Sequence, residues 1–182
     1  MSRTRRAAVA VAALVILFGL VGLLAWRAAS DSSDASDDPN GAAAAIAGSA
    51  GGVVSDAVAA AAPFENLTAG TIRVGDREVL VVVADSEVER AAGLRGRTGA
   101  TPYAGMLFVF DADTRAAFTM AGVPAPLDIA FYAADGSQVD RLRMEPCAGT
   151  DATCPIYQPS SPFRFALEAG PGALPAGSLR VR

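Results

Sequence analysis

The longest uncharged segment of the chain lies close to its N-terminus. Residues 7–26 contain no Asp, Glu or Arg. Twenty helical residues, at about 1.5 Å each, match a hydrocarbon core about 30 Å thick. Three arginines precede this run, and the acidic sequence "SDSSDASDD" follows it. Because positively charged flanks stay in the cytoplasm, we predict a cytoplasmic basic segment (1–6) and a single-pass transmembrane helix or signal-anchor (7–26).

A cleaved signal peptide is the alternative for the same segment. The apolar core of a signal peptide usually has about 7–15 residues, and Ala28-Ala29-Ser30 offers small residues for a cleavage site. The cytoplasmic membrane is the expected partner of residues 7–26. In one case the C-terminal domain stays anchored outside the cytoplasm, and in the other it is secreted.

Residues 27–63 are dominated by Ser, Asp, Ala and Gly in low-complexity order. Such a segment contains almost no large apolar side chains, so it cannot bury enough surface to offset the entropy of ordering. We therefore predict a disordered tether over 27–63.

The composition changes at Phe64, where short apolar runs alternate with Gly, Pro and Asp. This pattern of apolar runs and turn residues predicts strands at 71–74, 78–84, 105–113, 115–120, 127–133, 138–144, 163–168 and 178–182. Residues 85–94 predict one short helix, with a capping-box spacing at Ser86 and Glu89 and a terminating Gly93. Residues 64–182 are thus expected to form a compact, mainly β domain, either a β-sandwich or barrel-like.

The basic residues of the chain restrict its chemistry. All fifteen are Arg, and there is no Lys and no His. The absence of His excludes Ser-His-Asp and Cys-His catalysis and any His-ligated zinc site. A formal net charge of −4 gives no basic field for nucleic acid. We expect no metal site, no cofactor and no nucleic-acid partner.

Asp128 stands in the apolar sequence "PLDIAF". A buried acid must be hydrogen-bonded or paired, or its pKa rises. Three interpretations remain open. Asp128 is a ligand-binding or acid–base carboxylate, or the structural partner of an arginine among Arg95, Arg97 and Arg115. Alternatively, the strand points Asp128 into water.

Four more side chains are candidates for ligand binding: Glu145, Arg95, Arg97 and Tyr157. Arginine offers a planar fork for carboxylate or phosphate, and tyrosine offers a ring with a hydroxyl. An ordinary solvated loop is the alternative interpretation of this set.

Cys147 and Cys154 are the only cysteines and have six residues between them. Two thiolates without His cannot complete a four-ligand zinc site, and redox pairs usually have two intervening residues at the start of a helix. An extracytoplasmic location permits a disulfide. We predict a disulfide, with free thiols as the alternative.

Five blocks in the second half of the chain occur in a familiar order. They are "VADSEVERAAGL", "GMLFVF", "FTM" with "PLDIAFYAADGSQV", "MEPC…CPIY" and "FALE". In this order they resemble the bacterial and archaeal domain of unknown function 192 family, over roughly residues 70–182. The resemblance implies a compact, mainly β domain of jelly-roll-like topology, often secreted or membrane-anchored, whose activity is not established.

The chain departs from the family pattern at several positions. The family usually reads Phe-Trp-Met-Lys-Asn-Thr before Pro-Leu-Asp-Ile, whereas here Thr119 replaces Trp, and "AGV" at 121–123 replaces Lys-Asn-Thr. Arg95 stands where the family usually has Met. If the Lys-Asn pair contributes to a site, this chain has lost that contribution or rebuilt it with other residues.

These observations favour a tethered extracytoplasmic module that binds an envelope component or a protein partner without catalysis. The alternatives are a carboxylate-based enzyme acting on cell-envelope glycan and a thiol-redox protein using the two cysteines.

Overall fold

The structure is a computed structural model that describes residues 50 and 52–182. The segment predicted to cross the membrane, 7–26, lies outside the described residues, as does most of the predicted tether. Within the described part of the chain, no helix is long and apolar enough to cross a membrane.

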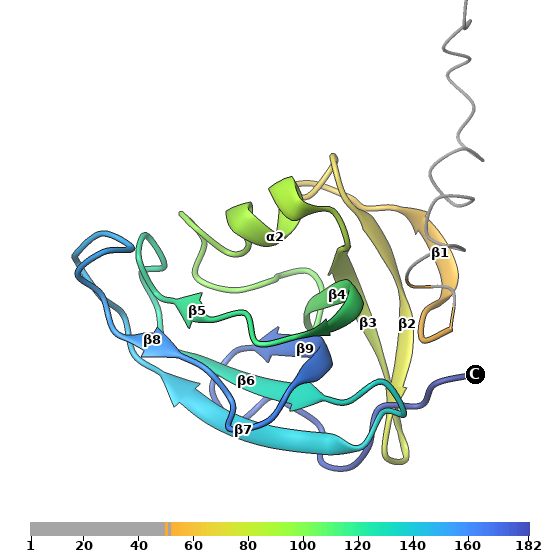
Figure 1. The fold of residues 1–182 in the computed structure, drawn as a ribbon. Coiled ribbons are helices and arrows are strands. Elements are labelled where there is room, and N and C mark those ends of the chain that lie inside the picture. Colours follow the sequence, from red (N-terminus) through yellow and green to blue (C-terminus); the bar gives the residue numbers. More distant parts are fainter. Residues whose placement is uncertain (1–49, 51) are drawn as a thin grey trace, which may run out of the picture. The chain divides into compact units, whose positions relative to one another are not determined.

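Seven strands form one mixed sheet in the order β1-β2-β3-β4-β9-β6-β7 (Figure 1). They are β1 (Ser55–Ala59), β2 (Thr68–Val74), β3 (Arg77–Ala84), β4 (Gly105–Thr114), β6 (Leu127–Tyr132), β7 (Gln138–Met144) and β9 (Phe163–Ala169). β3 and β4 are parallel, and the other neighbours are antiparallel. β5 (Phe118–Thr119) pairs with β8 (Ile156–Tyr157), and the helix α2 (Glu87–Ala92) connects β3 to β4. The predicted mainly β class with one short helix is confirmed.

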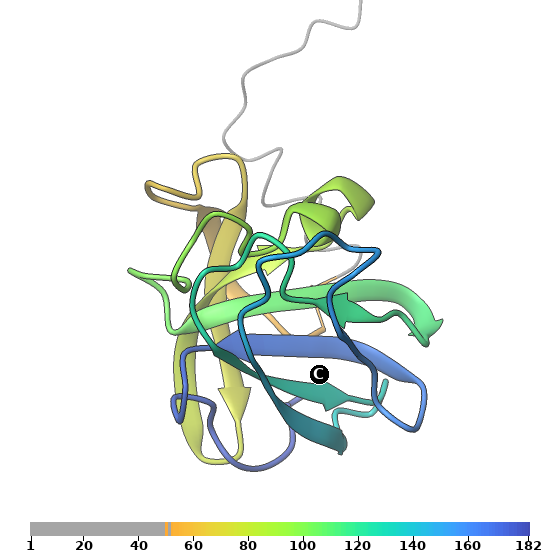
Figure 2. The ribbon, with the colours of Figure 1, turned by 90° about the vertical axis from the view of Figure 1, so that its left-hand side faces the viewer.

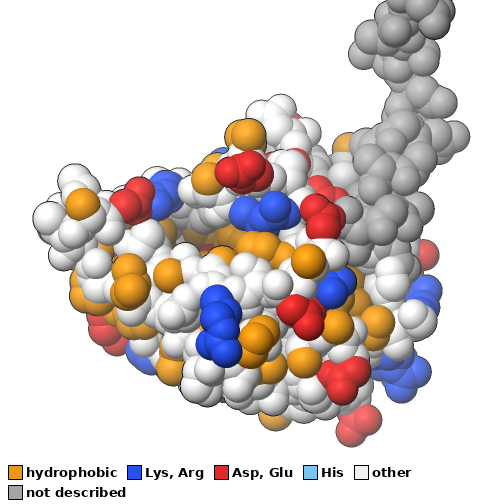
Figure 3. All heavy atoms as spheres, viewed as in Figure 1, with side chains coloured by type: hydrophobic (Ala, Val, Ile, Leu, Met, Phe, Trp, Pro, Cys, Tyr) orange, Lys and Arg blue, Asp and Glu red, His pale blue; other side chains and the backbone are white. Residues whose placement is uncertain are grey.

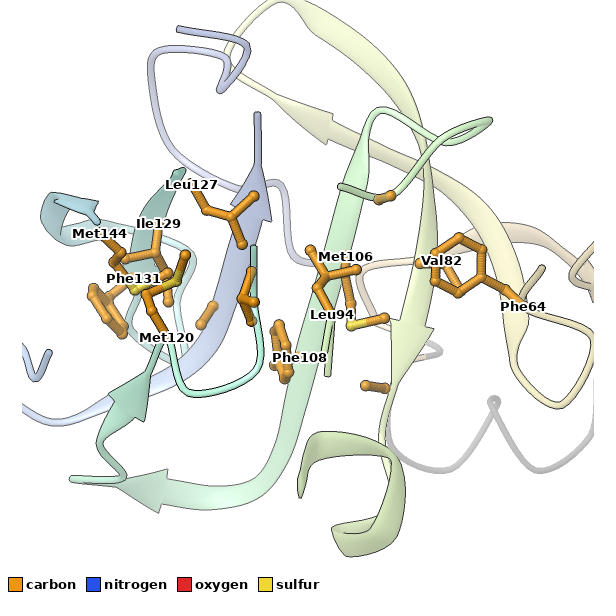
Figure 4. Close-up of a cluster of buried hydrophobic side chains, with 14 of the residues drawn as sticks. Phe64, Val82, Leu94, Met106, Phe108, Met120, Leu127, Ile129, Phe131 and Met144 are labelled. Atoms are coloured by element: carbon orange, nitrogen blue, oxygen red, sulfur yellow. The ribbon is translucent and has the colours of Figure 1, made fainter. Parts of the chain in front are cut away.

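The central strands are apolar on both faces, because alternate side chains enter two different cores. In β3, Val81 and Val83 belong to one core, and Val82 and Ala84 belong to the other. We call the second one the helix-side core. Its members include Phe64, Val82, Leu94, Met106, Phe108, Met120, Leu127, Ile129, Phe131 and Met144 (Figure 4).

The helix-side core lies on the face of the sheet that α2 covers. Figure 2 shows β4, β9 and β6 side by side, with α2 above them. Parallel strands such as β3 and β4 need a crossover connection rather than a tight turn. The chain therefore has to leave the sheet between Ala84 and Gly105, and α2 lies in that connection.

The predicted helix has the expected ends. The Ser86 side chain accepts a hydrogen bond from the N–H of Glu89, and the Glu89 side chain accepts one from the N–H of Ser86, which completes the capping box. Gly93 ends the helix with φ 47°, a conformation that favours glycine.

The structure corrects the predicted tether at its C-terminal end, because Ser55–Ala59 form β1 on the edge of the sheet. Gly70 of β2 permits this approach. A Cβ on Gly70 would lie 2.3 Å from Cγ1 of Val54 and 2.8 Å from the carbonyl oxygen of Ser55. Ordered structure thus includes residues 52–63, which the composition assigned to the tether.

Two predicted strands are much shorter in the structure than in the sequence analysis. Of the segment 115–120, only Phe118–Thr119 forms a strand. The segment 178–182 makes a single bridge, between Leu179 and Val74. Its backbone follows the domain surface, where Arg180 N–H donates to the carbonyl of Arg73 at 2.9 Å.

Candidate functional site

A cavity of about 360 Å³ lies between α2 and β5. Figure 3 shows this hollow, with hydrophobic side chains on its floor and charged side chains around it. Its walls come from α2 and the following turn, from β4, from the segment that leads into β5, and from β9. The lining residues are Glu87, Arg90, Ala91, Ala92, Gly93, Leu94, Arg95, Phe108, Phe110, Ala116, Ala117, Phe118, Thr119, Val123 and Glu168.

Glu168 is the polar group at the base of the cavity. It lies on β9, where its backbone is directly opposite Met106 of β4 and Ile129 of β6. Both of these neighbours belong to the helix-side core, so Glu168 points into an apolar environment. Only 6% of the residue is exposed.

The Glu168 carboxyl makes no hydrogen bond or ion pair with any of the described residues. Burial raises its pKa to about 8, because a carboxylate loses more by leaving water than a neutral acid does. Glu168 therefore carries its proton at neutral pH and can donate a hydrogen bond. Such a group is costly to bury without a partner. It is free to form a hydrogen bond with a molecule that enters the cavity.

Two arginines line the mouth of the cavity, and both are held by backbone carbonyls. Arg90 donates from Nη1 to the carbonyls of Asp85 and, at 2.8 Å, of Val109. Its guanidinium also lies 4.9 Å from the centre of the Phe110 ring. Arg95 donates from Nη1 to the carbonyl of Ala121 at 2.6 Å.

Arg95 is also tied to the cysteine loop. The predicted disulfide between Cys147 and Cys154 is present, with the two Cα atoms 5.8 Å apart. Within the loop that it closes, the Asp151 carboxylate accepts from Arg95 Nη2 at 2.6 Å. Cys147 forms a bridge with Ala121. The disulfide thus holds a loop whose acid positions an arginine at the cavity mouth.

The departures from the family pattern cluster at this mouth. Arg95, Thr119 and Val123 all line the cavity. The Arg95 side chain reaches the backbone of residue 121, where the family pattern has Lys. A cation supplied by a different segment therefore lies next to the position that has lost one.

Asp128 does not line the cavity. It pairs with Arg143 and accepts from Gly172 N–H at 2.6 Å. The hydrogen bond from Arg143 holds the pKa of Asp128 below its usual range against the opposing effect of burial, and Gly172 adds to the lowering. The structural interpretation thus fits the observed contacts, but its proposed partners, Arg95, Arg97 and Arg115, were wrong.

The correct partner of Asp128 could have been found in the sequence. The predicted hairpin of 127–133 and 138–144 places Asp128 opposite Arg143, and this is the observed register. Directly opposed residues in an antiparallel pair are close enough for opposite charges to interact.

The other predicted residues lie apart from the cavity. Glu145 donates its backbone N–H to the Tyr157 hydroxyl at 3.1 Å. Arg97 lies 4.4 Å from the centre of the Phe64 ring and lines a smaller cavity of about 250 Å³. Of the five candidates, only Arg95 lines the larger cavity.

Glu168 was not among the residues predicted from the sequence. The sequence "FRFALEAG" alternates as a strand, and Glu168 falls on the same face as Arg164, where the alternation allows a polar side chain. Unlike Asp128, it therefore gave no signal of burial. The described residues bring together no group of three or more Cys, Asp or Glu side chains that could hold a metal ion.

Two solved structures are similar to part of this chain. A protein of unknown function from Novosphingobium aromaticivorans DSM 12444 matches with 21% identity and a TM-score of 0.54, covering 68% of this chain and 91% of the other. A Sinorhizobium meliloti 1021 protein, whose description proposes a role in transcription regulation, matches with 24% identity and a TM-score of 0.48. That match covers 58% of this chain and 82% of the other. No curated protein matches the chain.

The profile of one protein family matches residues 70–181. This range contains β3 to β9, α2 and every residue that lines the larger cavity. The chain therefore belongs to the domain of unknown function 192 family, which is described as "Uncharacterized ACR".

Proposed function

We propose that this protein is a non-catalytic binding module that takes a small component of the cell envelope into the Glu168 cavity. Residues 7–26 tether it to the cytoplasmic membrane, with the β-domain outside the cytoplasm; cleavage of that segment would instead release the domain. The proposed tethering and location rest on the charge and hydropathy pattern of the N-terminal segment.

One observation carries the proposed binding function. Glu168 is buried at the base of a cavity and has no partner among the described side chains. Buried polar groups in proteins are almost always hydrogen-bonded, so a carboxyl left without a partner beside open space is explained by a ligand. The volume of about 360 Å³ lies at the small end of the range for ligand pockets.

The test is binding of a panel of envelope compounds to the full-length chain in a non-ionic detergent. The panel contains amino sugars, amino acids and short peptides, and binding is measured by calorimetry. Ala117 is an exposed residue in the lining of the cavity, so the large side chain of Ala117→Trp should obstruct the cavity mouth. Ala134→Trp places the same side chain in an exposed turn outside the lining.

We expect at least one compound to bind both the wild type and Ala134→Trp, and to bind Ala117→Trp at least tenfold more weakly. Equal binding to all three proteins would place the ligand elsewhere. If no compound binds, the small-molecule proposal is wrong.

An enzyme acting on envelope glycan is the second candidate, because Glu168 has a pKa of about 8. A general acid works best when its pKa is near the operating pH. Glycoside hydrolysis needs two carboxyl groups, and Glu87 lines the same cavity. Turnover of a glycan or ester by the wild type but not by Glu168→Gln would support this candidate. Equal rates for the two proteins would remove Glu168 from the reaction.

A further inference from the structure

Glu168 is the buried charge-forming group of the cavity, and its carboxyl has no ion-pair partner among the described residues. At the mouth, Arg95 is paired with Asp151 at 2.6 Å. Arg90 is held by two carbonyls, and the Asp85 carboxyl is close enough for their charges to interact. No arginine in the described part of the chain acts in this way on Glu168, whose pKa is raised by burial alone. The cavity floor therefore has an acid and no cation.

The walls around this acid are aromatic. Phe108, Phe110 and Phe118 all line the cavity, and the rings of Phe108 and Phe118 meet edge to face with centres 5.1 Å apart. The faces of aromatic rings attract cations, and quaternary ammonium ions are often bound in this way. One ring of this cavity already has a cation near its face, since Arg90 lies 4.9 Å from the centre of Phe110.

We propose that the ligand of this cavity is a compact organic cation, either a protonated amine or a quaternary ammonium ion, with the Glu168 carboxylate as its counter-ion. This inference rests on the proposed binding function and names its ligand class. The ion pair forms away from water, where opposite charges attract more strongly than in solution. The phenylalanine rings surround the apolar part of the cation.

A proton leaves when such a cation binds. Glu168 is neutral in the free protein at pH 7, so binding forms the carboxylate–cation pair and transfers one proton to the buffer. The other charged groups around the cavity are Glu87, Arg90 and Arg95, all on α2 or the turn after it. On the strands, the residues opposite Glu168 are Met106 and Ile129, which do not titrate.

The experiment compares choline with 3,3-dimethylbutan-1-ol, a neutral analogue in which carbon replaces the quaternary nitrogen. Both are titrated into the full-length chain by calorimetry from pH 6 to pH 9, in buffers with different ionisation enthalpies. We expect choline to bind at least tenfold more tightly than the alcohol at pH 8. Its affinity should rise about tenfold per pH unit below pH 8 and level off near pH 9.

Proton release is the second measurement. At pH 7 a group with a pKa of about 8 retains its proton in about nine of ten molecules, so choline binding should release about 0.9 proton. Binding of the alcohol should release none. If the alcohol binds as well as choline, or if choline affinity falls as the pH rises, the cation assignment is wrong.

Glu168→Gln keeps the size of the side chain and removes its charge, so we expect it to weaken choline binding at least tenfold at pH 8. Glu65→Gln, at an exposed position outside the lining of this cavity, is the matched control and should change it less than threefold. If choline fails but a neutral or anionic compound binds in a manner that Ala117→Trp blocks, the cation assignment is wrong and the binding function stands. If no compound of any charge binds, both proposals fail.

Discussion

At the scale of single residues, Glu168 and Asp128 show how similar carboxyl groups acquire opposite properties. Both residues are only 6% exposed. The pKa of Asp128 is lowered, chiefly by its hydrogen bond with Arg143. The pKa of Glu168 is raised to about 8 by burial without such a partner. Asp128 thus stabilises the fold as a carboxylate, whereas ionised Glu168 opposes it.

Glu168→Gln should alter how stability depends on pH. Below pH 4 both the folded and unfolded wild type hold the proton. Between about pH 4.5 and pH 8 only the unfolded state loses it, so the wild type loses stability as the pH rises. The variant lacks this penalty. We therefore expect the difference in unfolding free energy between the variant and the wild type to increase by about 3–5 kcal/mol from pH 4.5 to pH 8, in favour of the variant. Urea unfolding at pH 4.5, 6.5 and 8 measures the gain; a difference that does not vary with pH contradicts the assignment.

Asp128→Asn should destabilise the fold without altering the cavity. The variant loses the charged partner of Arg143, which should cost about 1–3 kcal/mol of unfolding free energy at pH 7. Because the pKa of Asp128 is lowered in the fold, this contribution is present above the ordinary aspartate pKa and disappears as the pH falls through the folded value. A double-mutant cycle with Arg143→Gln measures the coupling at pH 7 and pH 3. Coupling that persists unchanged at pH 3 would point to a cause other than the ion pair.

The residues also show what the sequence could reveal about the site. Asp128 was conspicuous because it interrupts an apolar strand, whereas Glu168 shares a face with Arg164 in the alternating sequence "FRFALEAG" and so gave no sign of its burial. What distinguishes their roles is the presence of a cation opposite one and of empty space beside the other. That difference depends on how α2 and β5 are placed over the sheet, and the local sequence does not determine it.

At the scale of elements, prediction succeeded where the determinants are local. The residues that cap α2 are close in sequence, and they form the expected capping box. The strand at 138–144 has its predicted bounds, and its partner differs from the prediction by one residue. β1 was missed because none of its five side chains is buried and apolar periodicity is therefore weak. It is ordered by pairing with β2, a contact between separate segments.

The cysteine loop is the element through which the mouth of the cavity can be altered. Replacing both Cys147 and Cys154 with Ser opens the loop, and the chain-entropy argument predicts a cost of about 2–3 kcal/mol in unfolding free energy. We also expect faster amide exchange at 148–153 and at Arg95, because Asp151 is no longer held in place. Hydrogen exchange measured by mass spectrometry checks both regions.

Asp151→Asn is the control for this experiment. It keeps the disulfide but weakens an exposed ion pair, which should cost no more than about 1 kcal/mol. If the double serine variant exchanges no faster than the wild type at Arg95, the loop does not position that side chain.

At the scale of the whole molecule, the folded unit extends further toward the N-terminus than its composition indicates. Val53 and Val54 are buried in the core on the opposite face from α2, together with Ile72. β1 also covers the edge of β2, which would otherwise expose unpaired backbone groups. A truncated chain that begins at Phe64 therefore lacks part of the domain and is unsuitable for functional tests.

A chain that begins at residue 64 should be less stable than one that begins at residue 50. Burial of a valine contributes about 1.5 kcal/mol or more, so losing Val53 and Val54 alone should cost about 3 kcal/mol. We expect the shorter chain to unfold at a lower urea concentration and to aggregate through the exposed edge of β2. Equal midpoints and equal monodispersity would show that β1 is dispensable.

The backbone contact between the two ends of the domain has a consequence for engineering. Arg182 N–H donates to the carbonyl of Gly52 at 2.7 Å, so the first and last described segments meet. A short linker could join Arg182 to Gly52, and new ends could be opened in the exposed loop at Ser160–Ser161. Such a circular permutant would keep β1 in the sheet while freeing the domain from its N-terminal segment.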